Sequence, residues 1–434
     1  MRIFVLDRNK KPLDPCHPAR ARQLLRSGRA AVFRRYPFTI ILRDRTLEAS
    51  VVHPHRVKID PGSKVTGLAL VREDTNRVVW AAEVEHRGEE IKRRLLERRA
   101  LRRARRNRKT RYRKPRFDNR RRPDGWLPPS LRSRVENAVT WAKRLCCWAP
   151  VVAVSMELVK FDAQKLQNPE ISGIEYQRGE LFGYEVREYL LEKWGRRCIY
   201  CGKTGIPLEI EHIIPKSRGG TDRVSNLTLA CHECNQKKGN RTAREFGHPE
   251  VQARARIPLK DAAASNATRW ELYRRLAGFG IPIEAGTGGR TKYNRTRLGL
   301  SKAHWIDAAC VGASTPDRLI LPRQVLRITA KGHGKRQRCG TDAHGFPVRH
   351  APRTKRFMGF QTGDLVRAVI PAGKFAGTHV GRIAIRHRPS FRLNGFDVHP
   401  KYICLLQEAD GYEYRKRKSG VSSPRLKTGA PDAA

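Results

Sequence analysis

The amino-acid sequence predicts a multidomain α/β protein, and three observations lead to that fold class. Residues 56–60, 65–71, 78–84 and 151–157 are short apolar runs bounded by turn residues, which is the pattern of strands in one mixed sheet. Two Cys-x-x-Cys pairs enclose a segment that is too short for an apolar core of its own. Residues 359–406 contain further short strand-like runs, which predict a small β-barrel of the SH3-like kind. A length of 434 residues leaves room for about three domains.

The charge of the chain indicates a polyanionic partner. Lysine and arginine number 90 against 41 acidic residues, so the formal net charge is +49 and the isoelectric point is near 10.9. This excess favours a long polyanion and argues against an ordinary enzyme of small molecules. We expect no membrane span, because no apolar run approaches about eighteen residues, and no secretory signal. The cysteines suit a reducing compartment better than a disulfide framework.

The two cysteine pairs predict a structural zinc site. Four thiolates, from Cys198, Cys201, Cys231 and Cys234, satisfy a tetrahedral Zn²⁺ and leave no open position. Such an ion lets a small module hold its shape. A plain zinc ribbon or unrelated buried thiols are the alternatives, and the regular spacing argues against unrelated thiols.

The segment between the cysteine pairs reads as a β-hairpin followed by a short helix. Residues 208–214 and 224–230 alternate like strands, an Arg-Gly-Gly-Thr turn lies between them, and residues 231–238 begin a helix. The runs Glu-His-Ile-Ile-Pro, Ser-Asn-Leu and Cys-x-x-Cys-Asn-Gln-Lys-Lys-Gly-Asn resemble the HNH nuclease family, whose fold is a ββα-metal module.

This resemblance implies the roles of four residues. His212, when neutral, takes a proton from the water that attacks phosphorus. Glu211 and Asn235 hold one Mg²⁺ through oxygen, and the ion stabilises the leaving oxyanion. Asn226 corresponds to the family residue that orients the catalytic histidine or its loop.

Three carboxylates elsewhere in the chain predict a second catalytic centre. Asp60 and Glu157 each end a predicted strand, Asp307 lies one turn into a predicted helix, and His304 precedes it by three residues. Three separated carboxylates are what a two-metal phosphodiester site needs. Structural acids around an inert scaffold are the alternative. The set resembles the split RuvC nuclease, an RNase H-like fold, with Asp60, Glu157 and Asp307 as ligands of Mg²⁺ or Mn²⁺ and His304 near the attacking water.

Residues 89–122 carry the strongest charge in the chain and predict an arginine-rich helix that ends at Pro115. Such a run is ordinarily a solvated face or a disordered tail, but this one lies between pieces of a predicted folded domain. We therefore expect nucleic-acid phosphates on more than one side of the helix. The run resembles the bridge helix of IscB proteins and their CRISPR-effector relatives, which grips the guide RNA. The arginines taken as nucleic-acid contacts are Arg94, Arg98, Arg102, Arg105 and Arg108.

The order of these segments resembles the IscB family, transposon-encoded RNA-guided endonucleases related to the CRISPR effectors. The HNH segment is inserted between the second and third RuvC pieces, which is the nested architecture of that family. The N-terminal segment reads as a strand at residues 2–6, a turn at 12–16, a short basic helix at 18–27 that Gly28 ends, and a strand at 38–42. It resembles the short domain of that family named for a Pro-Leu-Met-Pro motif, although Asp14 replaces the methionine. We predict an N-terminal domain (1–54), RuvC-I (55–86), a bridge helix (87–122), RuvC-II (123–195) with a helix at 176–194, HNH (196–248), RuvC-III (249–328) and a C-terminal region (329–434).

The resemblance implies an RNA-guided endonuclease that cuts double-stranded DNA. HNH would cut the guide-paired strand, and RuvC the displaced strand, next to a short target-adjacent motif. The C-terminal region would contact a stem of the guide RNA and that motif, with a disordered tail from Arg415 onward. We expect a monomeric complex with an omega-type guide RNA in the cytoplasm of a bacterium or archaeon.

The residues leave two other functions open. One is a protein-directed HNH endonuclease of the homing or restriction kind, which keeps the RNase H-like domain as a scaffold. The other is a catalytically silent RNA-binding protein of a transposon. Composition alone does not distinguish RNA from DNA as the partner.

Overall fold

The computed structural model describes residues 1–108, 126–158, 187, 190–191, 193–256, 262–332, 339–344, 346–350, 354–386 and 390–420. The predicted helix at 176–194 lies almost wholly outside the described residues, and so do the predicted end of the arginine-rich helix at Pro115 and the chain beyond residue 420.

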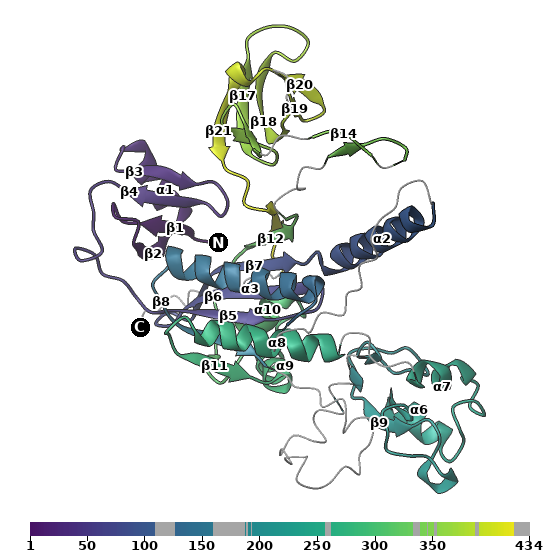
Figure 1. The fold of residues 1–434 in the computed structure, drawn as a ribbon. Helices are drawn as coiled ribbons and strands as arrows, with labels where there is room; N and C mark the ends of the chain where they lie inside the picture. Colours follow the sequence, from purple (N-terminus) through teal and green to yellow (C-terminus); the bar gives the residue numbers. More distant parts are fainter. Residues whose placement is uncertain are drawn as a thin grey trace, which may run out of the picture.

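The centre of the molecule is a seven-stranded mixed sheet (Figure 1). Its strand order is β11 (Ile283–Gly286), β8 (Val151–Glu157), β5 (His55–Asp60), β6 (Val65–Arg72), β7 (Arg77–Glu85), β12 (Gln324–Ala330) and β22 (Tyr412–Lys418). Strands β5, β6 and β7 form an antiparallel meander, while β8 runs parallel to β5 and β11 runs parallel to β8. The four predicted strands are therefore all present, and the sheet extends beyond them by β11, β12 and β22.

Helices cover both faces of this sheet, because its central strands are apolar on both sides. On one face α3 (Pro129–Trp148) and α8 (Ala262–Ala277) enclose a core that includes Leu68, Leu70 and the stacked rings of Trp80 and Trp141. On the other face α10 (His304–Ala309) packs on the alternate residues of β6, and α9 (Gly288–Arg297) lies beside it. The approach of α10 is close: a Cβ added at Gly67 would lie 1.9 Å from the carbonyl oxygen of His304.

The cysteine-rich segment folds as a separate module at the lower right of Figure 1. It contains β9 (Glu209–His212), the 3-10 turn η1 (Lys216–Arg218), β10 (Leu227–Ala230), α6 (His232–Lys238) and α7 (Pro249–Arg256). Strands β9 and β10 pair antiparallel, with His212 opposite Leu227. The predicted hairpin and short helix are thus found at the predicted residues.

The N-terminal unit is a four-stranded sheet with one helix. Strands β1 (Ile3–Leu6), β2 (Pro12–Cys16), β3 (Ala30–Arg34) and β4 (Thr39–Leu42) are ordered β2-β1-β4-β3, and α1 (Pro18–Arg26) ends before Gly28, as predicted. The prediction of a turn at residues 12–16 was wrong, because this segment pairs with β1. Proline is tolerated in β2 because β2 is an edge strand, where a missing backbone donor breaks no ladder bond.

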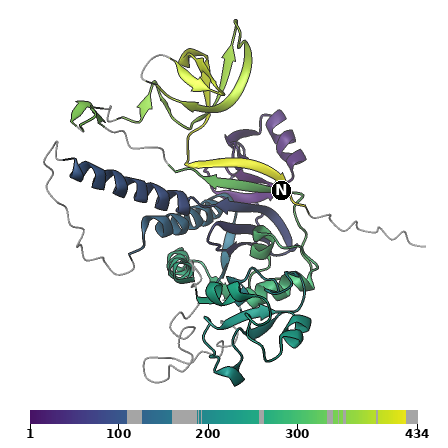
Figure 2. The same ribbon diagram turned by 90° about the vertical axis from the view of Figure 1, so that its right-hand side faces the viewer.

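The arginine-rich helix α2 (Gly88–Asn107) projects from the body of the molecule (Figure 2). Gly88 is its only buried residue, and even Leu96 and Leu101 are each 55% exposed. Over its described length the helix therefore offers charged side chains to the surroundings on every side.

The C-terminal region contains a five-stranded sheet, ordered β20-β19-β18-β17-β21. These strands are β17 (Leu365–Ile370), β18 (Gly377–Ala384), β19 (Phe391–Leu393), β20 (Phe396–Val398) and β21 (Ile403–Gln407), and they enclose their own apolar core. Two small hairpins precede them, formed by β13 (Gly340–Thr341) with β14 (Pro347–Arg349) and by β15 (Arg356–Phe357) with β16 (Phe360–Gln361).

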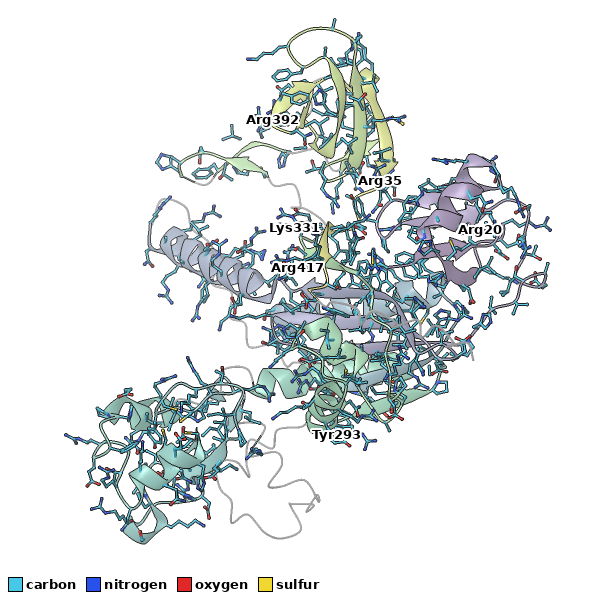
Figure 3. All side chains as sticks on the ribbon, turned by 180° about the vertical axis from the view of Figure 1, so that it is seen from behind. Arg20, Arg35, Tyr293, Lys331, Arg392 and Arg417 are labelled. Atoms are coloured by element: carbon cyan, nitrogen blue, oxygen red, sulfur yellow. The ribbon has the colours of Figure 1, made fainter. Side chains whose placement is uncertain are left out.

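The prediction of a disordered tail from Arg415 was wrong as far as Lys418. Strand β22 returns from the five-stranded sheet to the central sheet and pairs with β12 from Tyr412 to Lys418. Buried Tyr412 and Tyr414 anchor it against the core, while its basic residues face outward. Figure 3 shows Arg35, Lys331 and Arg417 where the C-terminal five-stranded sheet, the N-terminal unit and the central sheet come together.

No helix among the described residues has the length and apolar character needed to cross a membrane.

Candidate functional site

Four predicted residues come together at one edge of the central sheet. Asp60 ends β5 and Glu157 ends β8, and these neighbouring strands are parallel, so their carboxyl ends lie at the same edge. Helix α10 brings His304 and Asp307 to that edge by packing on β5 and β6. All four side chains line one pocket of about 140 Å³.

Two carboxylic acids of this acid pocket, Glu157 and Asp307, have raised pKa values. Burial and the neighbouring charge of Asp60 raise the pKa of Glu157 to about 7. The same two causes raise the pKa of Asp307. His304 Nδ1 lies 3.1 Å from Asp60 Oδ2, and this hydrogen bond raises the pKa of His304. The pocket therefore concentrates negative charge that a cation would neutralise.

Two arginines that sequence reasoning missed balance this charge. Arg269 of α8 lies 3.5 Å from Glu157 and also donates to the carbonyl oxygen of Pro61 at 3.3 Å. Arg295 of α9 lies 2.8 Å from Asp307. The start of α9 carries a usable signal, since Thr287 accepts a hydrogen bond from the backbone of Arg290 as an N-cap residue does.

The acid pocket fits hard divalent cations. Its donors are carboxylate oxygens, the type that Mg²⁺ and Mn²⁺ prefer, and mutual repulsion among them gives a cation a favourable place. Asp60, Glu157 and Asp307 are the residues that would hold the ions.

The four predicted zinc ligands also come together. The sulfur atoms of Cys198, Cys201, Cys231 and Cys234 all lie within 4.8 Å of one another. This arrangement of four thiol groups fits a tetrahedral zinc ion with no open position. Cys231 sits at the N-cap of α6, so an ion held there would tie the helix to the first cysteine pair.

His212 stands at the end of β9 and is not buried in the module. Its side chain is 26% exposed, and its Nε2 atom lies 2.8 Å from Asp222 Oδ1. Asn226 is buried, and its side-chain amide bonds to the backbone of Ile214 and Thr221. Asn226 therefore acts on the loop that follows His212 rather than on the imidazole itself.

Glu211 and Asn235, the two residues expected to share an ion, have different partners. Glu211 is 4% exposed, and its carboxylate accepts a hydrogen bond from Tyr200 at 2.7 Å and pairs with Lys238 at 2.5 Å. Asn235 donates to Glu209 at 2.7 Å. The Lys238 ammonium already neutralises Glu211, so this pair does not fit a shared metal ion as it stands.

The five arginines expected to bind nucleic acid lie along α2 and at its end. All of them are exposed. Arg94 pairs with Glu90, and Arg108 donates to the carbonyl oxygen of Ala343 at 3.2 Å. Arg98, Arg102 and Arg105 project from the same free helix.

Comparison with known proteins identifies two segments. Residues 198–249 match the family model of HNH endonucleases, and residues 3–179 match that of the RRXRR proteins. No curated protein matches the chain. The HNH match supports a nuclease.

Solved structures of Cas9 proteins are similar to part of the chain. For Streptococcus thermophilus Cas9 in complex with the AGAA PAM, the identity is 14% and the TM-score 0.21, over 59% of this chain and 32% of that one. For the Type II-C Cas9 of Actinomyces naeslundii, the identity is 15% and the TM-score 0.16, over 69% of this chain and 45% of that one. The chain thus covers less than half the length of either protein, and a likeness at these TM-scores supports no conclusion about function.

Proposed function

We propose that this chain is an RNA-guided endonuclease that cuts both strands of DNA at two separate centres, as IscB proteins do. The observation that carries the proposal is the convergence of Asp60, Glu157, Asp307 and His304 in one pocket, from segments far apart in the chain. The HNH match at residues 198–249 supports a second centre in that segment.

In the acid pocket, Asp60, Glu157 and Asp307 would hold the catalytic cations. Two Mg²⁺ ions, when bound, stabilise the attacking and leaving oxygens of phosphodiester hydrolysis. His304 holds Asp60 in place, and its side chain is 46% exposed at the pocket, where it can exchange a proton with the attacking water. This RuvC-type centre, on a sheet whose strand order supports an RNase H-like fold, would cut the displaced strand.

In the cysteine-rich module, called the zinc module from here on, His212 would take the proton from a water molecule that attacks phosphorus in the guide-paired strand. The four-cysteine zinc site would hold the β9–β10 hairpin and α6 in fixed positions relative to each other. The exposed arginines of α2 would bind the guide RNA by its phosphates, since an isolated helix of such charge repels itself without a polyanion. We further propose that one protein chain binds one guide RNA and that a transposon encodes the protein.

Strand-specific cleavage tests the two centres. Purified protein with its co-purifying RNA is given a DNA duplex labelled differently on each strand. Asp60→Ala should abolish cutting of one strand and His212→Ala cutting of the other, so that each variant leaves a nick. Asp317→Ala and His232→Ala are matched controls, because both side chains are exposed and lie outside the two centres. If neither Asp60→Ala nor His212→Ala changes cleavage, the assigned sites are wrong.

Ribonuclease treatment tests the guide. Protein treated with ribonuclease before DNA is added should lose cleavage, and adding back the co-purified RNA should restore it. Cleavage of the same sequence after full RNA removal would instead establish a protein-directed endonuclease.

A further inference from the structure

We propose that Asp222 is a positioning residue for His212 in the zinc module: it fixes the orientation and tautomer of the imidazole so that Nδ1 faces the attacking water. This inference rests on the proposed nuclease function and adds to it a residue that the motif did not identify.

The contact between the two side chains defines which imidazole nitrogen carries the proton. His212 Nε2 lies 2.8 Å from Asp222 Oδ1, and the other carboxylate oxygen of Asp222 lies 2.8 Å from the ammonium of Lys216. An ionised carboxylate only accepts hydrogen bonds, so a neutral His212 must donate from Nε2. The lone pair then sits on Nδ1, for which no hydrogen-bond partner occurs among the residues that the structure describes. An imidazole in this state is prepared to accept a proton at Nδ1.

The loop that carries Asp222 is pinned to the chain directly after His212. Asn226 accepts from the backbone nitrogen of Ile214 at 2.9 Å and donates to the carbonyl oxygens of Ile214 and Thr221, each at 2.9 Å. Gly220 allows this closure, because a Cβ at that position would lie 1.7 Å from the Ile214 carbonyl oxygen. The residues immediately before Asp222 are therefore held in place, and the buried asparagine acts on His212 through the loop and this carboxylate.

Asp222 contributes little to the stability of the fold. Its side chain is 51% exposed, and an ion pair that is so exposed adds little to stability because solvent screens it. A carboxylate that orients a histidine and stabilises its protonated form acts instead on the rate of proton transfer. Replacing a carboxylate that orients a metal-bound histidine typically lowers activity by about 10–100-fold, and we take the same range for Asp222.

The test uses the full-length protein with its RNA and a duplex labelled on both strands. Asp222→Ala is compared with wild type and with Glu245→Ala, which removes another exposed acid of the same module. Single-turnover rates are measured over a range of protein concentrations, so that DNA affinity and the cleavage step are separated. We expect Asp222→Ala to slow cutting of the His212-dependent strand by about 10–100-fold, with DNA affinity and the other strand's rate unchanged.

Nitrogen NMR of ¹⁵N-histidine-labelled protein supplies a readout that does not depend on cleavage. Above the histidine pKa, the His212 signals, identified by their loss in His212→Ala, should report protonated Nε2 in wild type and a mixture of tautomers in Asp222→Ala. The inference is overturned if Asp222→Ala cuts both strands like wild type, if both strands slow equally, or if wild-type His212 carries its proton on Nδ1. Failure of the proposed function looks different: His212→Ala itself would then leave cleavage of both strands unchanged.

Discussion

Replacing Glu157 should remove part of the pH dependence of stability in protein that is free of divalent cations. The folded protein raises the pKa of Glu157 from an ordinary 4.5 to about 7, by burial and the charge of Asp60. Between these values the folded state binds more protons than the unfolded state, so the free energy of unfolding falls as pH rises. The stabilisation is complete below about pH 4.5 and is lost as pH passes about 7.

The size of this effect follows from the two pKa values. A shift from 4.5 to about 7 corresponds to about 3 kcal/mol, and the side chain is only 12% exposed, so solvent screening reduces it little. For a domain of the size of the central sheet with its helices, that free energy corresponds to roughly 6–12 °C in the melting temperature. Asp307 and His304 also have raised pKa values, so a pH dependence of the same sign but smaller size should remain in Glu157→Gln.

Thermal melting from pH 5 to pH 8 measures this difference. The buffer is freed of divalent cations by resin rather than by a chelator, which would also remove zinc from the cysteines. Glu136→Gln serves as the control, because Glu136 is an exposed acid on α3 that pairs with Arg275 outside the acid pocket. Adding Mg²⁺ should stabilise wild type more at pH 8 than at pH 5, because protons compete for Glu157 at the lower pH.

Parallel melting curves for wild type and Glu157→Gln across the whole pH range would refute the reasoning. That result would mean that Glu157 ionises normally, and hence that the carboxylates do not converge as the structure places them. Equal stabilisation of both proteins by Mg²⁺ would separately refute Glu157 as a ligand.

Three further predictions concern other parts of the chain. Lys238→Met removes the cation that pairs with the buried Glu211 carboxylate, so it should lower the stability of the cysteine-rich module by about 3–5 kcal/mol, measured by hydrogen exchange. The double variant Lys238→Met/Glu211→Met should recover most of that loss, and no recovery would mean that the two side chains are not coupled. Cys231→Ser should weaken zinc binding and make residues 198–249 sensitive to protease, while the central sheet stays resistant. Equal protease sensitivity of the central sheet and of residues 198–249 would contradict a local role for the ion. Gly67→Ala places a Cβ 1.9 Å from the His304 carbonyl oxygen and should displace α10 with His304 and Asp307. Cleavage at the acid pocket should therefore fall about 100-fold, while the His212-dependent nick persists. Unchanged cleavage of both strands would show that α10 does not need this close approach.

The sequence was sufficient for the parts of the fold in which local pattern and tertiary structure agree. The strands that end in Asp60 and Glu157, the hairpin that carries His212 and the helix that begins at His304 all lie where apolar periodicity and turn residues predict them. The resemblance to the split RuvC nuclease indicated which side chains would converge, and the parallel pairing of β5 with β8 explains why Asp60 and Glu157 end at one edge of the sheet.

The structural features that the sequence did not predict depend on contacts between residues that are distant in sequence. The basic residues of β22 have the composition of a solvated tail, but in the folded chain they pair with β12. Pro12 is typical of a turn, but its segment pairs with β1 as an edge strand. Arg269 and Asp222 have no distinctive local signal, since arginine is common throughout the chain and Asp222 lies in an ordinary loop. Their contacts with Glu157 and His212 exist only in the folded chain.

The zinc module is inserted in the chain beside the acid pocket. The chain leaves the central sheet directly after Glu157, at the edge that carries the acid pocket, and returns through α8, whose Arg269 pairs with that same residue. Arg196, at the start of the module, lines the acid pocket together with Arg295. Residues near both ends of the inserted module therefore lie at the acid pocket. A nucleic acid bound at that pocket would contact Arg196 and Arg269, so we expect its binding to bias the placement of the module that carries His212.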